Sequence, residues 1–381
     1  MRVVRVRTHS TAAGQGAISP WADPVGALPI LGEPLAQRQE RLARALGLTW
    51  AGEADGPGTE SDTLWWDDDV DVSLLTLKRL LQARREGQLA LVERPERPVR
   101  EGGLDLEPLG PGGSRLFGLR IGRSGEPIVL QPRGFAGSVN LPLGRTLETF
   151  ATVQTATTIR HWVHLLRANL AAILPRIVER TLMAPWLPLW AFVRHAGRAL
   201  GCAVGRGTHI HPTARIEGCV VGRNVQIGAF TILRGCVIGD GAIVEDHATA
   251  RLSFIGEKSH LANFAMFNLS VLGARSSVGH IGAQASILGD DTFLSTFATL
   301  QDLALQGNVR VRLGDAIVDS GTPFLGSALG HRVRIGSGIT IAPGRWIDND
   351  TTLVSDDVVR SPPGKGSHGS GPVGGSAWRP L

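Results

Sequence analysis

The sequence predicts a mainly β protein whose C-terminal half is a left-handed parallel β-helix, preceded by a small α/β domain and a helical connector. Three observations support this. Aliphatic–glycine pairs recur every 17 residues, aliphatic residues within each unit recur about every six, and 49 glycines supply many turns. A step of six is neither a strand period nor a helix period, so it fits a triangular coil with one short strand on each side.

The aliphatic–glycine pairs mark corresponding corners of successive coils. They are Val204-Gly205, Val221-Gly222, Ile238-Gly239, Ile255-Gly256 and Leu272-Gly273, with Leu288-Gly289 one residue early. Glycine here suits a turn with unusual backbone angles or close packing. Further along, the step of six continues through Leu329, Ile335, Ile341, Ile347 and Leu353. We therefore expect the β-helix to span residues 201–356; a β-sandwich does not explain a sustained period of 17.

Two further features belong to the repeat region. The register is broken between Leu288 and Leu325, so we expect a loop within 300–319 that leaves the solenoid, a frequent place for function. Cys202, Cys219 and Cys236 are 17 residues apart, which is neither a zinc spacing nor a catalytic motif. We expect three stacked thiols in a reducing compartment.

The composition bounds the function. Hydrophobic residues make up 43% of the chain and charged residues 19%, as in a soluble protein with a core. The net charge of +5 comes almost entirely from scattered arginines, which argues against nucleic-acid binding. The N-terminus has no apolar stretch of signal-peptide type, and the apolar run 181–193 is too short to span a bilayer. We expect a cytoplasmic protein.

The remaining segments have distinct characters. Residues 1–145 mix strand-like, helix-like and Gly/Pro-rich pieces, 146–200 are expected to form a helical connector, and 357–381 a disordered tail. The connector combines apolar residues with six arginines: Arg160, Arg167, Arg176, Arg180, Arg194 and Arg198. This pattern fits packing across the mouth of the β-helix, which we favour. It also fits peripheral contact of 160–198 with an anionic membrane at its inner face.

The repeat resembles the hexapeptide-repeat (left-handed β-helix) transferase superfamily. The resemblance covers residues 201–356 and implies a homotrimer with ligand sites between neighbouring β-helices. The order of the three blocks resembles the bifunctional sugar-1-phosphate nucleotidyltransferase/acetyltransferases. In that family a Lys-x-x-His-Leu segment carries a catalytic histidine, and Glu257-Lys258-Ser259-His260-Leu261 is similar, with one residue fewer between lysine and histidine. The tyrosine that often follows is absent.

This resemblance implies a set of site residues. His260 is the candidate general base, and Lys258 and Asn263 are candidate substrate-binding residues. The stretch from Leu329-Gly330-His331 to Ala342-Pro343-Gly344 resembles the family's stretch beside the acyl-CoA site. It implies that Gly336, Ser337 and Ala342 contact an acyl-CoA or acyl-carrier donor.

The N-terminal block resembles a nucleotidyltransferase domain more faintly. Residues 28–35 are similar to the segment that opens a helix there, 64–69 to the strand that delivers a metal-binding aspartate, and 74–85 to the next helix. The Gly-x-Gly-Thr-Arg loop is missing, and only Gly14-Gln15-Gly16 stands nearby. We interpret the block as truncated and inactive, with Asp67, Asp68 and Asp69 in a solvated acidic turn.

Three functions stay open at this point. The first is acyl transfer from an acyl-CoA or acyl carrier to a sugar or sugar nucleotide. The second is a non-catalytic sugar-nucleotide-binding or assembly scaffold derived from such enzymes, and the third is nucleotidyl transfer. No metal is expected, because the histidines lack the five-residue pair that zinc-binding β-helices use.

Overall fold

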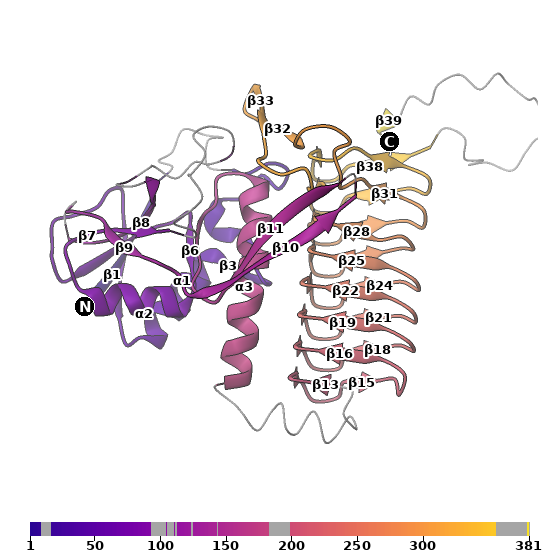
Figure 1. Cartoon of the computed structure of the whole chain (residues 1–381), viewed down its shortest axis with the longest axis horizontal. Coiled ribbons are helices and arrows are strands. Elements are labelled where there is room, and N and C mark those ends of the chain that lie inside the picture. The colour runs from indigo at the N-terminus through magenta and orange to yellow at the C-terminus, as the bar shows by residue number, and fades with distance from the viewer. Residues whose placement is uncertain are drawn as a thin grey trace, which may run out of the picture.

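The computed structural model describes residues 1–8, 17–92, 104, 110, 113–122, 125–142, 144–182, 199–355 and 379–380. The chain forms an N-terminal α/β block, a long helix, and a C-terminal solenoid of stacked triangular coils (Figure 1). The helix stands between the block and the solenoid, with its axis along the direction in which the coils stack (Figure 1).

The N-terminal block is built on a six-stranded sheet in the order β4-β1-β5-β8-β7-β9. β1 is parallel to β4 and β5, β8 is antiparallel to β5 and β7, and β7 is parallel to β9. The strands are β1 (Arg2–Val6), β4 (Thr49–Ala54), β5 (Thr63–Asp67), β7 (Gly87–Leu91), β8 (Arg115–Ile121) and β9 (Ile128–Leu130). Their apolar faces form a core around Trp66, Leu77 and Leu119.

Short elements complete the block. They are the 3₁₀ turn η1 (Val25–Ala27), β2 (Pro29–Ile30), β3 (Glu33–Pro34), α1 (Leu35–Ala45), β6 (Val70–Val72), α2 (Leu74–Ala83), β10 (Gly134–Leu141), β11 (Arg145–Thr152) and β12 (Ala156–Thr158). The predicted strand at 64–69 is β5, the predicted helix at 74–85 is α2, and the segment 28–35 opens α1. Ser73 caps α2 by accepting a hydrogen bond from the Thr76 amide.

The helical connector begins later than predicted. Residues 145–152 are not helical but form β11, which pairs with β10 at every position from Arg145 to Thr152. The physical reason is local, because this segment holds three threonines and a phenylalanine, residue types that favour a strand. Within the described residues, the helix α3 runs from Trp162 to Leu182.

The solenoid coils have three sides. Side 1 carries β13 (Ala199–Leu200), β16 (Arg215–Glu217), β19 (Ile232–Arg234), β22 (Thr249–Arg251), β25 (Met266–Asn268), β28 (Ala283–Gln284), β31 (Thr299–Leu300) and β36 (Thr340–Ile341). Side 2 carries β14 (Ala203–Val204), β17 (Val220–Val221), β20 (Val237–Ile238), β23 (Phe254–Ile255), β26 (Val271–Leu272), β29 (Ile287–Leu288), β34 (Ala328–Leu329) and β37 (Trp346–Ile347). Side 3 carries β15 (His209–Ile210), β18 (Gln226–Ile227), β21 (Ile243–Val244), β24 (His260–Leu261), β27 (Ser277–Val278), β30 (Phe293–Leu294), β35 (Arg334–Ile335) and β38 (Thr352–Val354).

The interior of the solenoid confirms the interpretation of the repeat. One aliphatic residue per side points inward and is buried, and neighbouring coils pair in parallel. Gly239 shows why the repeat needs glycine, since a Cβ there would lie 2.5 Å from the Glu257 amide nitrogen of the next coil. The three cysteines are buried and stacked as predicted, with the Cys219 amide 3.2 Å from the Cys202 sulfur.

α3 covers side 2 rather than the open end of the solenoid. The outward-facing residues Val237, Phe254 and Val271 on side 2 are apolar, and they pack with Trp162 and Leu166 of α3 in one core. The expectation that the connector closes the mouth of the β-helix is therefore wrong, because the apolar surface that needs cover lies along a side. Residues 183–198 lie outside the described part of the chain. Within the described residues, no helix is long and apolar enough to cross a membrane.

The predicted excursion from the solenoid is present. After β31 the chain leaves the coil and forms the hairpin β32 (Arg310–Leu313) and β33 (Ala316–Asp319) before returning at β34. The excursion packs on the start of α3, where the carbonyl oxygens of Arg312 and Ser320 meet His161 Nε2 at 2.9 Å and Arg167 at 3.0 Å. It thus holds α3 in place.

The predicted disordered tail lies mostly outside the described residues. Its exception is β39 (Arg379–Pro380), which pairs antiparallel with β38 at the C-terminal end of the solenoid.

Candidate functional site

His260 lies on the outer face of side 3, between two polar side chains from the neighbouring coils. Its Nε2 is 2.8 Å from Oε1 of Glu245 and its Nδ1 is 3.2 Å from Oγ of Ser277. The strand register stacks Ile243, His260 and Ser277 in one outward column, so each coil adds one side chain to this face. The His260 side chain is 34% exposed, and the imidazole is therefore open to a ligand.

Glu245 reaches His260 from the corner between sides 3 and 1. The equivalent residues one coil before and two coils after are Gly228 and Gly279, where a Cβ would lie 2.4 Å from Asp246 Oδ1 and 2.6 Å from the Thr296 amide nitrogen, so the corner is tightly packed at those two coils. The second carboxylate oxygen, Oε2, accepts a hydrogen bond of 3.0 Å from the Asn263 amide. Two donors thus hold one carboxylate in a fixed position.

In the neutral form of the imidazole, these contacts favour one tautomer. An ionised carboxylate only accepts hydrogen bonds, so His260 Nε2 carries a proton and donates a hydrogen bond to Glu245. Nδ1 then carries a lone pair, which accepts from the Ser277 hydroxyl. A neutral imidazole with a bound carboxylate on one nitrogen and a lone pair on the other is the arrangement that a general base requires.

A ladder of aromatic rings runs along the corner between sides 3 and 1, beside Glu245, His260 and Ser277. Phe230, His247 and Phe264 stack with centroids 5.1 and 4.9 Å apart, and His280 and Phe297 continue the ladder edge to face. The three phenylalanines are more than half exposed. All three, with His247, have positive φ between 55° and 61°, a region that costs non-glycine residues energy. Large rings thus occupy an exposed corner where glycine or asparagine fits better.

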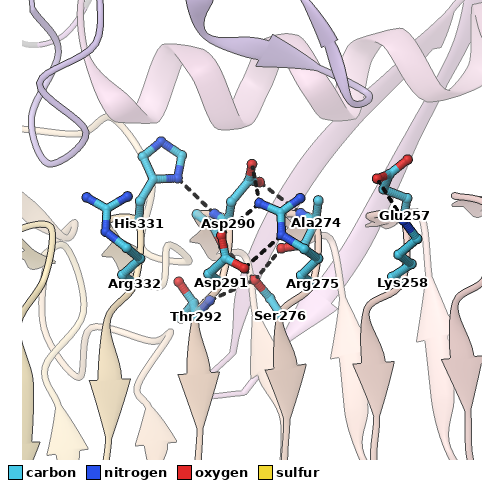
Figure 2. A network of polar contacts seen from close by, with 12 residues as sticks. Glu257, Lys258, Ala274, Arg275, Ser276, Asp290, Asp291, Thr292, His331 and Arg332 are labelled. Atoms are coloured by element: carbon cyan, nitrogen blue, oxygen red, sulfur yellow. Dashed lines mark hydrogen bonds and ion pairs between the residues drawn. The ribbon is translucent and has the colours of Figure 1, made fainter.

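The structure separates the two predicted substrate-binding residues. Lys258 sits at the corner between sides 2 and 3, where its side chain is 70% exposed and its ammonium lies 4.0 Å from Glu257 (Figure 2). No hydrogen bond or ion pair within the described residues joins Lys258 to His260. Asn263 lies at the other end of the His260 strand. It contacts the site through a hydrogen bond from its backbone amide to the carboxylate of Glu245.

The predicted donor-binding residues also fall on different corners. Ser337 and Gly336 share the corner of Asn263, but three coils further on, which is about 14 Å at about 4.8 Å per coil. The Ser337 hydroxyl donates to the Thr296 carbonyl oxygen at 2.5 Å. Ala342 follows β36 at the corner between sides 1 and 2, where its carbonyl accepts from Ser327. Gly336 and Ser337 therefore share an edge with His260, and Ala342 does not.

His331 is a structural histidine. Its Nδ1 accepts a 2.9 Å bond from the Asp290 amide, and its Nε2 lies 3.0 Å from the carboxylate of Asp23 in the N-terminal block. Both ring nitrogens are therefore used. Figure 2 shows His331 at the corner between sides 2 and 3, beside the Arg275–Asp291 pair. This corner links charges from coil to coil and ties the solenoid to the block.

Asp67 and Asp69 are buried and Asp68 is partly buried, so the expectation of a solvated acidic turn is wrong. Asp67 pairs with Arg120 at 2.8 Å, and Asp69, which is fully buried, pairs with Arg160 at 2.8 Å. Burial raises the pKa of Asp67 to about 6 although Arg120 opposes the shift. Guanidinium groups thus occupy the positions where a metal ion would bind these carboxylates. Within the described residues, no group of three or more metal-ligating side chains is present.

Comparisons with known proteins found matches among solved structures. No family model and no curated protein matches the sequence. A point mutant of GDP-perosamine N-acetyltransferase from Caulobacter crescentus, in complex with CoA and GDP-perosamine, is 18% identical, with a TM-score of 0.17, over 43% of this chain and 58% of that one. Arabidopsis UDP-N-acetylglucosamine acyltransferase is 11% identical, with a TM-score of 0.17, over 40% of this chain and 67% of that one. The stacked parallel sheets of the solenoid are those of a parallel β-helix.

At these TM-scores neither likeness carries an argument about this chain. This chain spans 58% of the first structure's length and 67% of the second's. The resemblance of the N-terminal block to a nucleotidyltransferase stays a prediction.

Sequence reasoning missed Glu245 and Ser277, although both lie one coil from His260. The available signal was Glu245 at a corner position where the two preceding coils have His211 and Gly228 and the three following coils have Ala262, Gly279 and Ser295, since Glu245 is the one carboxylate among these six.

Proposed function

We propose that this protein is an acyltransferase of the hexapeptide-repeat type that moves an acyl group from an acyl-CoA or acyl carrier to a sugar or sugar nucleotide. The observation that carries the proposal is the contact of His260 with Glu245 and Ser277 on an exposed face. Such a fixed imidazole is suited to removing a proton from an attacking amine or hydroxyl.

The proposed reaction uses the lone pair on His260 Nδ1. The acceptor amine or hydroxyl attacks the thioester carbonyl while Nδ1 takes its proton, directly or through the Ser277 hydroxyl. A C–N or C–O bond forms, the C–S bond breaks, and the imidazolium returns the proton to the leaving thiolate. Glu245 stabilises the imidazolium and keeps the ring from turning, because it holds Nε2 in place.

The test is release of free thiol from acetyl-CoA and longer acyl-CoAs in the presence of a panel of amino-sugar nucleotides. His260→Gln should lower turnover by about 10²–10⁴ while acyl-CoA affinity stays nearly unchanged. The matched control is His209→Gln, because His209 occupies the same outward column of side 3 at the first coil and is exposed. The control should keep full turnover.

The same assay separates this proposal from the scaffold function. A scaffold would bind a sugar nucleotide in a thermal-shift screen but release no thiol with any acyl-CoA. Full turnover in His260→Gln would also reject the role assigned to His260. The donor contacts predicted for Ser337 are tested by a bulky replacement, Ser337→Trp, which should weaken donor binding before it affects turnover.

A further inference from the structure

A charged cavity of about 500 Å³ lies between the N-terminal block and α3, away from side 3. It opens where the turn between β2 and β3 and the helix α1 face the last turns of α3. Its charged lining consists of four arginines and two glutamates: Arg38, Arg41, Arg176, Arg180, Glu33 and Glu179. This volume lies within the range of small-molecule sites.

The carboxylates of the cavity do not balance its cations. Glu33 binds Arg41 through both oxygens at 2.8 and 2.9 Å. Glu179 is shared more loosely, 3.8 Å from Arg41 and 3.6 Å from Arg176. Arg180 adds a fourth guanidinium to the lining. Even after Arg38 is assigned to its buried partner Asp71 outside the cavity, three arginines face two glutamates.

Arg176 shows the consequence of this imbalance. Its side chain is 29% exposed, and burial together with the neighbouring Arg180 lowers its pKa. The partly buried Arg176 and the exposed Arg180 lie one helical turn apart on α3, so their guanidinium groups repel each other in the lining of the cavity. A bound anion would remove this repulsion, and the planar fork of arginine matches the oxygens of a phosphate group.

An apolar cavity of about 180 Å³ adjoins the charged one and shares Arg38, Arg41, Arg176 and Glu179 with it. The rest of its lining is mostly apolar and includes Leu42, Leu74, Leu75, Ala172, Pro175 and Val178. The two cavities thus lie side by side against the same four side chains, one with a charged lining and one with an apolar lining. A ligand that fills both cavities carries a phosphate group and an apolar body.

We propose that this double cavity binds a phosphate-bearing small molecule with an apolar moiety, its phosphate on Arg176 and Arg180 and its apolar part against Pro175 and Leu74. The site lies on the opposite side of α3 from the solenoid chemistry, and it does not depend on His260 being a base. Because α1 and α3 both line it, a ligand here would bridge the N-terminal block and the helix that covers side 2.

The test is calorimetric titration of the full chain with hexyl phosphate at low ionic strength. Arg180→Gln and Arg176→Gln should each weaken binding by at least about 10-fold, since a hydrogen bond to a charged group is lost. Arg206→Gln is the control, because Arg206 is an exposed arginine at a corner of the first coil. Thermal unfolding of each variant without ligand confirms that the fold is intact.

Three further probes define the ligand class. Hexanol, which lacks the phosphate, should not bind, and inorganic phosphate should bind more weakly than hexyl phosphate. Uridine monophosphate replaces the alkyl chain by a nucleobase; tighter binding than hexyl phosphate assigns the apolar cavity to a base, and weaker binding assigns it to an alkyl group. Binding of hexyl phosphate that is absent, or unchanged in both arginine variants, would overturn the proposal.

Discussion

The carboxylate of Glu245 lies 2.8 Å from His260 Nε2, although 15 residues separate the two in the chain. The coil geometry brings them together, because one turn of the solenoid places the corner before His260 beside the strand of the next coil. Asp23 and His331 show the same kind of contact at 3.0 Å across 308 residues, but there the second imidazole nitrogen is occupied by a backbone amide. The two acid–histidine pairs therefore have different uses.

Replacing Glu245 by glutamine should lower kcat with little change in KM. The amide of glutamine has one acceptor oxygen for two donors, His260 Nε2 and the Asn263 amide, so one of these bonds is lost. We expect a loss of about 10-fold or more, smaller than that of His260→Gln. A raised KM with normal kcat would contradict a positioning role for Glu245.

The Asp23–His331 contact should stabilise the whole chain. His331→Gln should cost about 1–2 kcal/mol of unfolding free energy, since the half-buried imidazole joins two parts of the fold. The control is Asp350→Asn, which removes the exposed pair between Asp350 and Arg332 one residue further on and should change stability little. Urea unfolding measures both. Equal effects of the two substitutions would argue against the link.

Unfolding should become easier on acidification because of two buried histidines. Burial lowers the pKa of His161 to about 4 and that of His164 to about 3. Below about pH 6.5 these histidines therefore bind protons in the unfolded chain but not in the folded chain. The free energy of unfolding falls by about 1.4 kcal/mol per pH unit for each histidine. This loss continues until the folded groups protonate.

Asp67 acts in the opposite direction within part of this window. Its raised pKa of about 6 means that its contribution to stability is present below about pH 3.8 and is lost as the pH rises through 6. The combined contribution of His161, His164 and Asp67 to the slope between pH 6 and 4 should equal that of about one histidine. His164→Gln should remove about 1.4 kcal/mol per pH unit from the slope between pH 6.5 and 4, measured by denaturant titrations across this range. An unchanged slope would show that His164 is not a buried neutral group.

Asp69 should matter for folding and not for metal binding. Asp69→Ala removes a fully buried carboxylate that pairs with the 35% exposed side chain of Arg160, and the loss of this charged hydrogen bond should cost about 1.5–3 kcal/mol. Asp62→Ala, which breaks an exposed pair with Arg2, is the control. The wild-type protein should release no pyrophosphate from nucleoside triphosphates with Mg²⁺ and any sugar-1-phosphate. Release that Asp69→Ala abolishes would show an active nucleotidyltransferase.

The aromatic ladder should be covered by other copies of the chain. We expect a homotrimer, with a mass three times the chain mass of 40.5 kDa by light scattering. Phe264 is 63% exposed in the single chain, and Phe264→Asp should shift the mass toward the monomer because it places a charge on this apolar corner. A monomer mass for the wild-type chain at micromolar concentration would contradict the expectation.

The sequence by itself determined the solenoid, since each coil is made from residues that are close in the chain and its pattern repeats at each turn. The buried thiols, the corner glycines such as Gly239 and the break before Leu325 could all be predicted from that period. His260 was found because it falls in a segment resembling a known one, but Glu245 and Ser277 were not, because side-chain contacts between coils depend on rotamers that a period does not encode.

Only the tertiary structure decided where the rest of the chain lies. The helix α3 packs along the apolar outward column of side 2, which has Phe254 at its centre. No local pattern in residues 162–182 distinguishes that side of the solenoid from its open end. In the sequence, the aspartates at 67–69 predict a solvated or metal-binding turn. In the tertiary structure, Arg120 and Arg160 from distant segments pair with Asp67 and Asp69. A local repeat can be recognised from residues that are close in the sequence. Burial and ion pairing depend on which distant segments pack against each other and exclude water.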